Sequence, residues 1–342
     1  MIICAICGKR PAAKVIGACS DCLRSLPEGE LSPAFHKAPR EKLSLPEVPP
    51  KVPAGPKCHL CANECQPGPG KKGYCGLRKN AGSKISGISS PTTALAHIYL
   101  DPLPTNCCAA WFCEGSEERG SNLAVFFYGC NFDCLFCQNH SHKRLDEAPL
   151  LTEEMIVRAA LLPEVRCVCF FGGSPEPQLP FAIRVSRRIL EESDKKKRIC
   201  WEWNGCGHPR LVEKAVELSA ESGGTVKFDL KCFHRHISLA LCGVENHRAY
   251  ENFSLVWRLF PKGDLLTATT LLVPYYVDKQ EVGEIARFIS EQDRDIPYSL
   301  LVFHPDYLMT DLPPTPREQV ERCYNEARRY LSRVNVGNLP LL

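Results

Sequence analysis

The stretch Cys130-Asn131-Phe132-Asp133-Cys134-Leu135-Phe136-Cys137 carries three cysteines separated by three and then two residues. Three thiolates from one short loop can hold three irons of a [4Fe–4S] cluster and leave the fourth iron open for a ligand. The next cysteine along the chain is Cys167, so no fourth ligand is available at short range. A zinc site or three buried cysteines is the alternative, although three thiolates alone do not complete tetrahedral zinc.

The segment that precedes this loop indicates where the loop lies in the fold. Residues 122–128 are mostly apolar and predict a buried strand, and Gly129 provides the turn into the loop. A loop that directly follows a strand lies at the carboxyl end of that strand, where α/β folds place their chemistry. The three cysteines are therefore predicted at the active edge of a sheet.

Composition narrows the class of protein. The chain has 342 residues, a formal net charge of +3 and no long basic run, so neither nucleic acid nor an acidic membrane is an expected partner. No apolar stretch reaches about 18 residues, and the N-terminus does not resemble a signal peptide, so we expect a cytoplasmic protein. Many of the 21 cysteines fall in Cys-x2-Cys pairs. This pattern favours metal binding in a reducing, anaerobic host over a disulfide scaffold.

Residues 1–26 form the first predicted unit. Two Cys-x2-Cys knuckles offer a tetrahedral thiolate site for zinc, or for iron as in rubredoxin, through Cys4, Cys7, Cys19 and Cys22. A structural metal is the simplest interpretation, and a docking module or an electron relay is the alternative. Residues 27–57 are rich in proline and charge and predict a largely extended linker with little core of its own.

Residues 58–121 form a second cysteine-rich region. Cys58, Cys61, Cys65 and Cys75 can close around one ion, which predicts a second metal site with zinc or mononuclear iron. The segment also contains Cys107, Cys108 and Cys113. These three cysteines either add ligands to an auxiliary centre or are reactive thiols near the active site, and the sequence does not decide between the two.

From residue 122 to residue 342 the predicted elements alternate between strand and helix. The apolar runs predict strands at 123–128, 167–171, 199–204, 225–230, 267–273 and 298–303. Helices are predicted at 153–162, 178–193, 209–222, 247–259, 279–292 and 316–332, the last two opening with capping boxes at Asp278 and Thr315. Regular β-then-α order predicts an α/β fold with a parallel sheet, in the form of a partial (β/α)6 barrel.

Each predicted strand after the first ends in candidate site residues, which are polar or glycine except at the fifth strand. In chain order they are Gly172, Gly173, Ser174 and Glu176, then Glu202 and Asn204, then Asp229 and Lys231, then Val273, and finally His304. Because the carboxyl ends of parallel strands share one rim, we expect these residues to line one pocket. A structural ion pair is the alternative for Asp229 and Lys231. An ordinary histidine is the alternative for His304.

These motifs resemble the radical S-adenosylmethionine (SAM) superfamily. Phe136 matches the aromatic position of its cysteine motif, and Gly172-Gly173 resembles the element that receives the SAM amino group, with Glu176 as a late acid. The strand ends Glu202-Trp-Asn204, Asp229-Leu-Lys231 and Phe303-His304 are similar to those of pyruvate formate-lyase-activating enzymes. The radical SAM protein of the AmmeMemoRadiSam group is more similar still, through residues 58–78, 129–139 and 303–307.

The resemblance implies function, cofactors and residue roles. It implies a [4Fe–4S] cluster on Cys130, Cys134 and Cys137 and reductive cleavage of SAM to a 5′-deoxyadenosyl radical that abstracts hydrogen from a protein or peptide, such as a glycyl-radical enzyme. Catalytic roles are implied for the three cysteines, Asp229, Lys231 and His304. SAM contacts are implied for Phe136, Gly172, Gly173, Ser174, Glu176, Glu202, Asn204, Lys231, Val273 and His304.

Partners and rival functions complete the predictions. A reductant such as ferredoxin or flavodoxin is implied, and the ribbon of residues 1–26 favours a macromolecular substrate. One alternative is a radical SAM enzyme that acts on a small molecule. Another is a non-catalytic iron–sulfur and zinc module for electron transfer or binding. The open cluster and the balanced charge speak against this last function.

Overall fold

A computed structural model describes residues 1–27, 29, 34–104, 107–261 and 263–342. Among these residues, nine strands form one sheet in the order β13-β12-β11-β10-β9-β8-β6-β5-β7. The seven strands from β13 to β6 are parallel, whereas β5 and β7 are antiparallel additions at one edge. The predicted α/β fold with a mostly parallel sheet, typical of a radical SAM partial barrel, is confirmed.

The strands of this sheet are β5 (Thr93–Pro102), β6 (Ser121–Phe127), β7 (Leu150–Thr152), β8 (Val165–Gly172), β9 (Arg198–Trp203), β10 (Val226–Asp229), β11 (Leu266–Leu272), β12 (Tyr298–Val302) and β13 (Val334–Gly337). The helices of this region are α3 (Glu153–Ala160), α4 (Leu179–Glu192), α5 (Pro209–Ser222), α6 (Arg235–Cys242), α7 (His247–Leu259), α8 (Lys279–Gln292) and α9 (Arg317–Ala327). All six predicted strands and all six predicted helices are present. Strands β5, β7 and β13 and helix α6 were not predicted.

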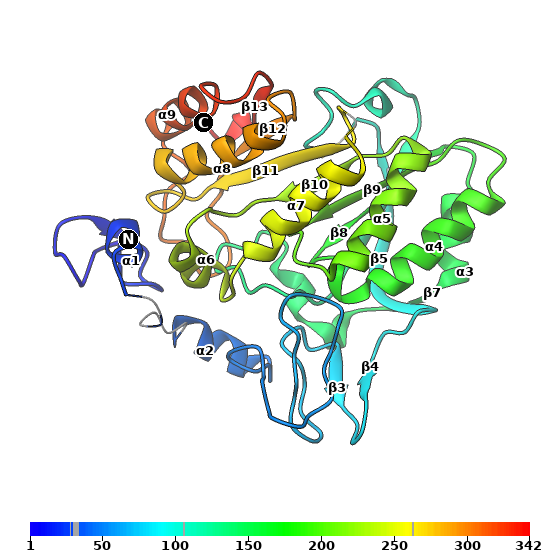
Figure 1. Ribbon diagram of the computed structural model, residues 1–342, viewed down its shortest axis with the longest axis horizontal. Coiled ribbons are helices and arrows are strands. Elements are labelled where there is room, and N and C mark those ends of the chain that lie inside the picture. The colour runs from blue at the N-terminus through cyan, green and yellow to red at the C-terminus, as the bar shows by residue number, and fades with distance from the viewer. Residues whose placement is uncertain (28, 30–33, 105–106, 262) are drawn as a thin grey trace.

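Successive residues of each strand point to opposite faces of the sheet, one packed against the helices and the other facing the cavities. The rings of Phe170, Trp201 and Trp203 stack in a row, with centroids 4.7 and 5.6 Å apart, and the Trp201 indole N–H donates to the Ala215 carbonyl of α5 at 2.9 Å. The connecting helices α3, α4, α5 and α7 lie together over this face (Figure 1). The intervening residues point to the other face, where Cys200 and Glu202 line cavities.

The capping predictions had two outcomes. Asp278 caps α8 as predicted, because its carboxylate accepts from the backbone N–H groups of Gln280 and Glu281. The prediction for Thr315 is wrong: its hydroxyl accepts from Phe303 N at 2.8 Å and donates to the Leu272 carbonyl at 2.7 Å. The N-cap residue of α9 is therefore Pro316, and Thr315 joins the ends of β11 and β12 instead.

The segment predicted as an extended linker contains a helix, α2 (Ala34–Lys42), with Pro39 inside it. The prediction of a largely extended segment without core is therefore wrong for this part. His36 and Arg40 are buried, at 0% and 2% exposure, and both contact the cysteine loop described below. Tertiary contacts to buried polar groups thus hold a helix in a segment whose composition disfavours one. Residues 28 and 30–33 of this predicted linker lie outside the described part.

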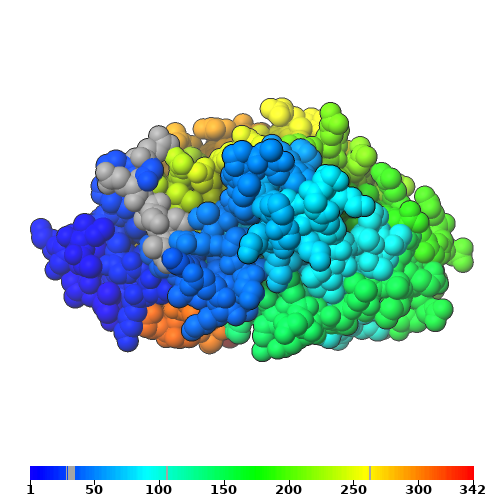
Figure 2. Space-filling model, turned by 90° about the horizontal axis from the view of Figure 1, so that it is seen from below, coloured from blue at the N-terminus to red at the C-terminus, as the bar shows by residue number. Residues whose placement is uncertain are grey.

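The N-terminal regions pack against the sheet domain. They contain β1 (Ile2–Ile3), β2 (Pro11–Ala12), α1 (Ser20–Arg24), β3 (Arg78–Asn80) and β4 (Ile85–Gly87). Figure 2 shows this blue and cyan part of the chain over much of one face of the molecule. Arg24 fixes the ribbon to α8, with contacts of 2.8 Å to Asp278 and 3.0 Å to Glu281.

The predicted boundary between the second cysteine-rich region and the barrel does not match the sheet. Strand β5 belongs to the region 58–121 but pairs with β6, so the predicted boundary between residues 121 and 122 falls inside the sheet.

None of the helices in the described part of the chain has the length and apolar character needed to cross a bilayer.

Candidate active site

The cysteine loop borders a cavity of about 660 Å³ at the carboxyl ends of the parallel strands. This volume is in the range of pockets that hold small-molecule cofactors. Of the residues predicted from the strand ends and the cysteine motif, the following line it: Cys130, Cys134, Phe136, Cys137, Gly172, Gly173, Ser174, Glu202, Asn204, Asp229 and Lys231. The structure brings these residues to one cavity. The roles predicted for them in binding a cluster and SAM stay a prediction.

Asp133 anchors the loop between the first two cysteines. Its carboxylate lies 3.0 Å from His36 Nδ1 and 3.4 Å from Arg40 Nη1, and it also pairs with the Lys143 ammonium. Burial alone would raise the Asp133 pKa, but the hydrogen bond from His36 and the charges of Lys143 and Arg40 bring it below its ordinary value. A charge at this depth requires such partners, so α2 and the loop are mutually dependent.

A chain of side-chain amides connects the loop to the strand ends. Asn204, after β9, donates to Asn131 Oδ1 at 2.7 Å and to the Ser174 hydroxyl at 2.9 Å. Asn63 donates to the Asn131 carbonyl at 2.7 Å from the region before the sheet. Asn204 and Ser174 therefore hold the framework of the site as well as line its cavity.

Gly172 and Gly173 occupy positions that no other residue fits. Gly172 has φ +109°, and an added Cβ would lie 2.6 Å from Phe127 N. At Gly173 an added Cβ would lie 2.3 Å from the Gly129 carbonyl oxygen and 2.8 Å from the His142 ring. The two glycines let β8 approach the cysteine loop closely.

Lys231 places a positive charge beside the cysteine loop. Its ammonium pairs with the Asp229 carboxylate and lies 5.8 Å from the centre of the Phe136 ring. Burial opposes this charge, but Asp229 and then Cys134 raise the Lys231 pKa above its ordinary value. Lys231 therefore keeps its positive charge and can offer it to a bound ligand.

Three predicted site residues do not line the cavity. Glu176 is fully buried behind it, and its Oε1 accepts from Gly205 N at 2.8 Å. Val273 is buried in the core beyond the end of β11. The His304 side chain is half exposed and pairs with Asp306 at 3.1 Å. Because Phe303 points into the core at 0% exposure, the next residue along the extended chain points outward.

His142, on a short turn after the loop, also lines the cavity and was not among the residues predicted from the sequence. Its Nε2 lies 3.6 Å from Cys137 Sγ, and its buried Nδ1 has no partner among the described residues. Burial and the nearby Lys143 lower the His142 pKa to about 3, so the ring is neutral. A histidine in a loop carries no periodic signal, so spacing alone could not have identified it.

The donor set fits an iron–sulfur cluster with an open position. Three thiols from one loop face one cavity, which the two glycines and Lys231 also line. A hydrogen bond with Cys242 outweighs burial and lowers the pKa of Cys134, whereas burial raises that of Cys137 to about 11. A metal cluster binds the thiolate form, which would offset the burial that favours the neutral thiol of Cys137.

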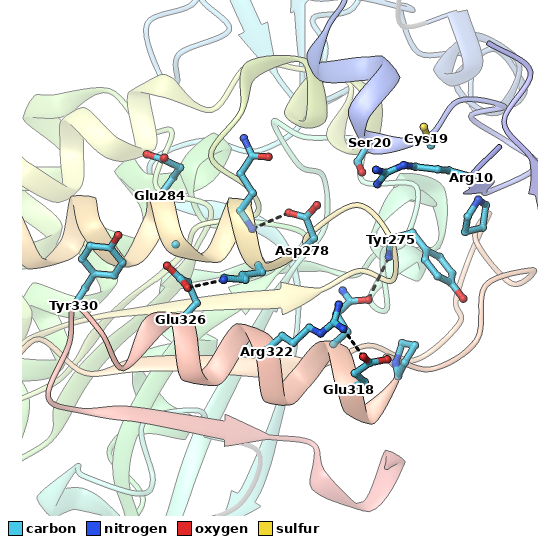
Figure 3. A pocket seen from close by; sticks show the side chains of 16 residues that line it. Arg10, Cys19, Ser20, Tyr275, Asp278, Glu284, Glu318, Arg322, Glu326 and Tyr330 are labelled. Carbon is cyan, nitrogen blue, oxygen red and sulfur yellow. Dashed lines mark hydrogen bonds and ion pairs between the residues drawn. The ribbon is translucent and has the colours of Figure 1, made fainter. Parts of the chain in front are cut away.

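The ribbon cysteines form a second and tighter set. The ligand atoms of Cys4, Cys7, Cys19 and Cys22 all lie within 4.8 Å of one another, with Sγ–Sγ distances of 3.8 Å for Cys4–Cys22 and for Cys7–Cys19. A zinc ion with Zn–S bonds of about 2.3 Å separates its four sulfurs by about 3.8 Å. A groove beside this set separates Arg10 and Ser20 of the ribbon from α8 and α9 (Figure 3). The predicted four-cysteine site is present, and the identity of its metal is a proposal.

The third set consists of Cys58, Cys61, Cys65 and Cys75, which line one small cavity with Arg78. Burial raises the Cys61 pKa most, and the three other cysteines raise it further. These four thiols therefore share one cavity, but they are spaced more widely than the ribbon set. Metal binding at this set stays a prediction.

Comparisons with known proteins place this architecture in a family. The radical SAM superfamily is matched over residues 124–289. The chain is 26% identical over 297 residues to an uncharacterized protein of Methanocaldococcus jannaschii, which covers 83% of this chain and 81% of that protein. It is 24% identical over 236 residues to pyruvate formate-lyase 1-activating enzyme of Escherichia coli K12, which covers 64% of this chain and 93% of that enzyme.

A structural comparison gives a weaker match. A radical SAM methyltransferase from Sphaerobacter thermophilus superimposes with a TM-score of 0.49 and 13% identity, over 64% of this chain and 66% of that one. The resemblance to the AmmeMemoRadiSam group is not tested by these findings and stays a prediction. The chain belongs to the radical SAM superfamily and is related to the pyruvate formate-lyase-activating enzymes.

Proposed function

We propose that this radical SAM enzyme acts on a protein or peptide substrate. The observation that carries the site assignment is the convergence of Cys130, Cys134 and Cys137 with Lys231 and Asn204 on one cavity. The relation to an enzyme named for activating pyruvate formate-lyase supports a macromolecular substrate, and so does the ribbon beside the groove on α8 and α9.

Different residues of this cavity would bind the cluster and SAM. Cys130, Cys134 and Cys137 would each hold one iron of a [4Fe–4S] cluster, and Lys231 would neutralise a carboxylate of SAM. Gly172 and Gly173, which line the cavity without side chains, would let their backbone groups approach the ligand. When bound, the cluster and SAM supply a 5′-deoxyadenosyl radical that abstracts a hydrogen atom from the substrate.

We also propose partners and metals outside this cavity. A low-potential reductant such as ferredoxin or flavodoxin would supply electrons to the cluster. Zinc would occupy the ribbon site, whose sulfur distances suit a tetrahedral ion. A second metal centre would bind at the Cys58 set, whose four thiols line one cavity at a wider spacing than in the ribbon.

SAM binding by Lys231→Ala tests the site. Loss of a charged contact in a desolvated pocket costs about 2–5 kcal/mol, so the affinity for SAM should fall at least about 30-fold. The matched control is Lys79→Ala, an exposed lysine on β3. Equilibrium binding of SAM to anaerobically reconstituted protein is the measurement. An unchanged affinity for SAM in Lys231→Ala would show that this lysine does not contact SAM.

A second assay separates the substrate classes. Release of 5′-deoxyadenosine by the reconstituted enzyme with SAM and dithionite is compared with and without glycyl-radical enzymes and peptides. Stimulation by a protein or peptide supports the proposal. Stimulation by small molecules alone would favour the alternative enzyme class.

A further inference from the structure

A second cavity lies on the inner face of the sheet, toward the amino ends of β8, β9 and β10. Five cysteines line it: Cys107 and Cys113 from the segment before β6, Cys167 and Cys169 from β8, and Cys200 from β9. Tyr99, Pro104, Cys107, Phe171 and Glu202 line both this cavity and the candidate active site. The two spaces are therefore neighbours with a common wall.

Four of these thiols surround two residues of the β10 segment. Lys227 Nζ lies 3.6 Å from Cys107 Sγ and 3.8 Å from Cys169 Sγ. Thr225 lies 3.8 Å from Cys113 Sγ through its hydroxyl and 3.4 Å from Cys200 Sγ through its backbone N–H. Cys169 and Cys200 are register partners on adjacent strands. The four sulfurs thus come from two strands and one loop to a single space.

The four thiols also influence one another. Burial is the main reason that the pKa of Cys113 is raised, and Cys200 and Cys107 raise it further. The pKa of Cys169 is likewise raised by burial and, to a smaller extent, by the same two cysteines. Cys107 and Cys200 therefore lie within electrostatic range of both Cys113 and Cys169, and Cys167, the fifth cysteine of the cavity, is hydrogen-bonded to Cys200.

The charge in this cavity is unusual for ordinary core packing. Free cysteines are often buried as small apolar side chains, and that would explain one or two of them. It does not explain why the thiols surround Lys227, an ammonium that is 2% exposed and whose carboxylate partner is Glu202 at 3.2 Å. Glu202 offsets the cost of this buried ammonium, and thiolates bound to a metal centre would place further negative charge beside it.

We propose that Cys107, Cys113, Cys169 and Cys200 bind an auxiliary iron–sulfur cluster, separate from the cluster of the SAM site. A single metal ion is the wrong size: among the described residues, only the ribbon set brings three or more ligand atoms within 4.8 Å of one another. The loop cysteines Cys130, Cys134 and Cys137 are also spread more widely than that set. Irons and sulfides between the thiolates account for such spreading.

This assignment has a consequence for the role of the centre. Four thiolates leave no open iron, so the cluster exchanges electrons and does not bind SAM. Its place behind the wall of the SAM cavity suits that role. The inference concerns these cysteines alone and does not rest on the proposed substrate.

Iron and sulfide content test the proposal in a background that lacks the SAM-site ligands. The background is Cys130→Ala, Cys134→Ala and Cys137→Ala, which keeps the result independent of the proposed function. After anaerobic reconstitution, the further change Cys169→Ala with Cys200→Ala should remove up to about four irons and four sulfides per chain. Cys323→Ala, a buried cysteine on α9, is the matched control and should remove none. Equal iron in all three proteins would overturn the proposal.

A footprint on the natural sequence covers the case in which the double variant fails to fold. The full chain is alkylated with N-ethylmaleimide before and after reconstitution, and modified cysteines are identified by mass spectrometry. Cys107 and Cys113 are only partly buried, so they should react before reconstitution and be protected after it. Protection of Cys137 without protection of Cys107 and Cys113 would refute the site, as would zinc in place of iron and sulfide.

Discussion

The pH dependence of stability caused by Glu176 reports on the contacts between the ends of β8 and β9. The side chain is fully buried, its Oε1 accepts from Gly205 N at 2.8 Å, and its Oε2 contacts the Ser174 hydroxyl. Burial raises its pKa from the ordinary 4.5 to about 7, although both hydrogen bonds favour the charged form. A rise of this size corresponds to about 3 kcal/mol of preference for the protonated carboxyl in the folded state.

The sign of the pH dependence follows from this rise. Because the folded-state pKa lies above the unfolded value, the contribution to stability is fully present below pH 4.5 and is lost as the pH rises through about 7. Glu176→Gln preserves the shape and the bond from Gly205 but cannot ionise. Relative to this variant, the free energy of unfolding of the unsubstituted chain should fall by about 2–3 kcal/mol between pH 5 and 8.5.

The assay is urea unfolding of the metal-free protein, followed by far-ultraviolet circular dichroism at several pH values. Glu164→Gln, a substitution at an exposed glutamate, is the control and should follow the unsubstituted chain at every pH. If the stability curves of Glu176→Gln and the unsubstituted chain stay parallel across this range, the carboxyl is not held in the environment described here.

Three further outcomes are expected. Asp133→Asn should lower the free energy of unfolding by about 3–5 kcal/mol, because it leaves the buried Lys143 without a carboxylate; an unchanged urea midpoint would contradict this. Gly173→Ala should reduce the iron bound after reconstitution, since its Cβ would lie 2.3 Å from a loop carbonyl oxygen, and full iron occupancy would argue against the close approach. Cys4→Ser with Cys22→Ser should remove one metal ion per chain in elemental analysis and leave the iron content unchanged, whereas a loss of iron would link the ribbon to the clusters.

Local patterns in the sequence were sufficient for the sheet and for most of the site. The spacing of the loop cysteines and the strand-end positions of Asp229 and Lys231 depend only on neighbouring residues, and the structure brings them to one cavity. His304 does not line the cavity, because its side-chain direction depends on how Phe303 enters the core. Strand β5 was missed because its pairing with β6 is antiparallel and follows no β-then-α pattern.

The contacts that hold the cysteine loop explain why the regions before the sheet cannot be treated as additions to a complete barrel. Asn63 donates to the Asn131 carbonyl, and two residues of α2 contact Asp133. Loss of those partners would leave a buried charge poorly compensated, at a cost of about 3–5 kcal/mol, so the loop conformation depends on them. The ribbon of residues 1–26 differs, because Arg24 joins it to α8. A role confined to substrate handling is therefore consistent with the ribbon, whereas α2 and Asn63 are part of the framework of the active site.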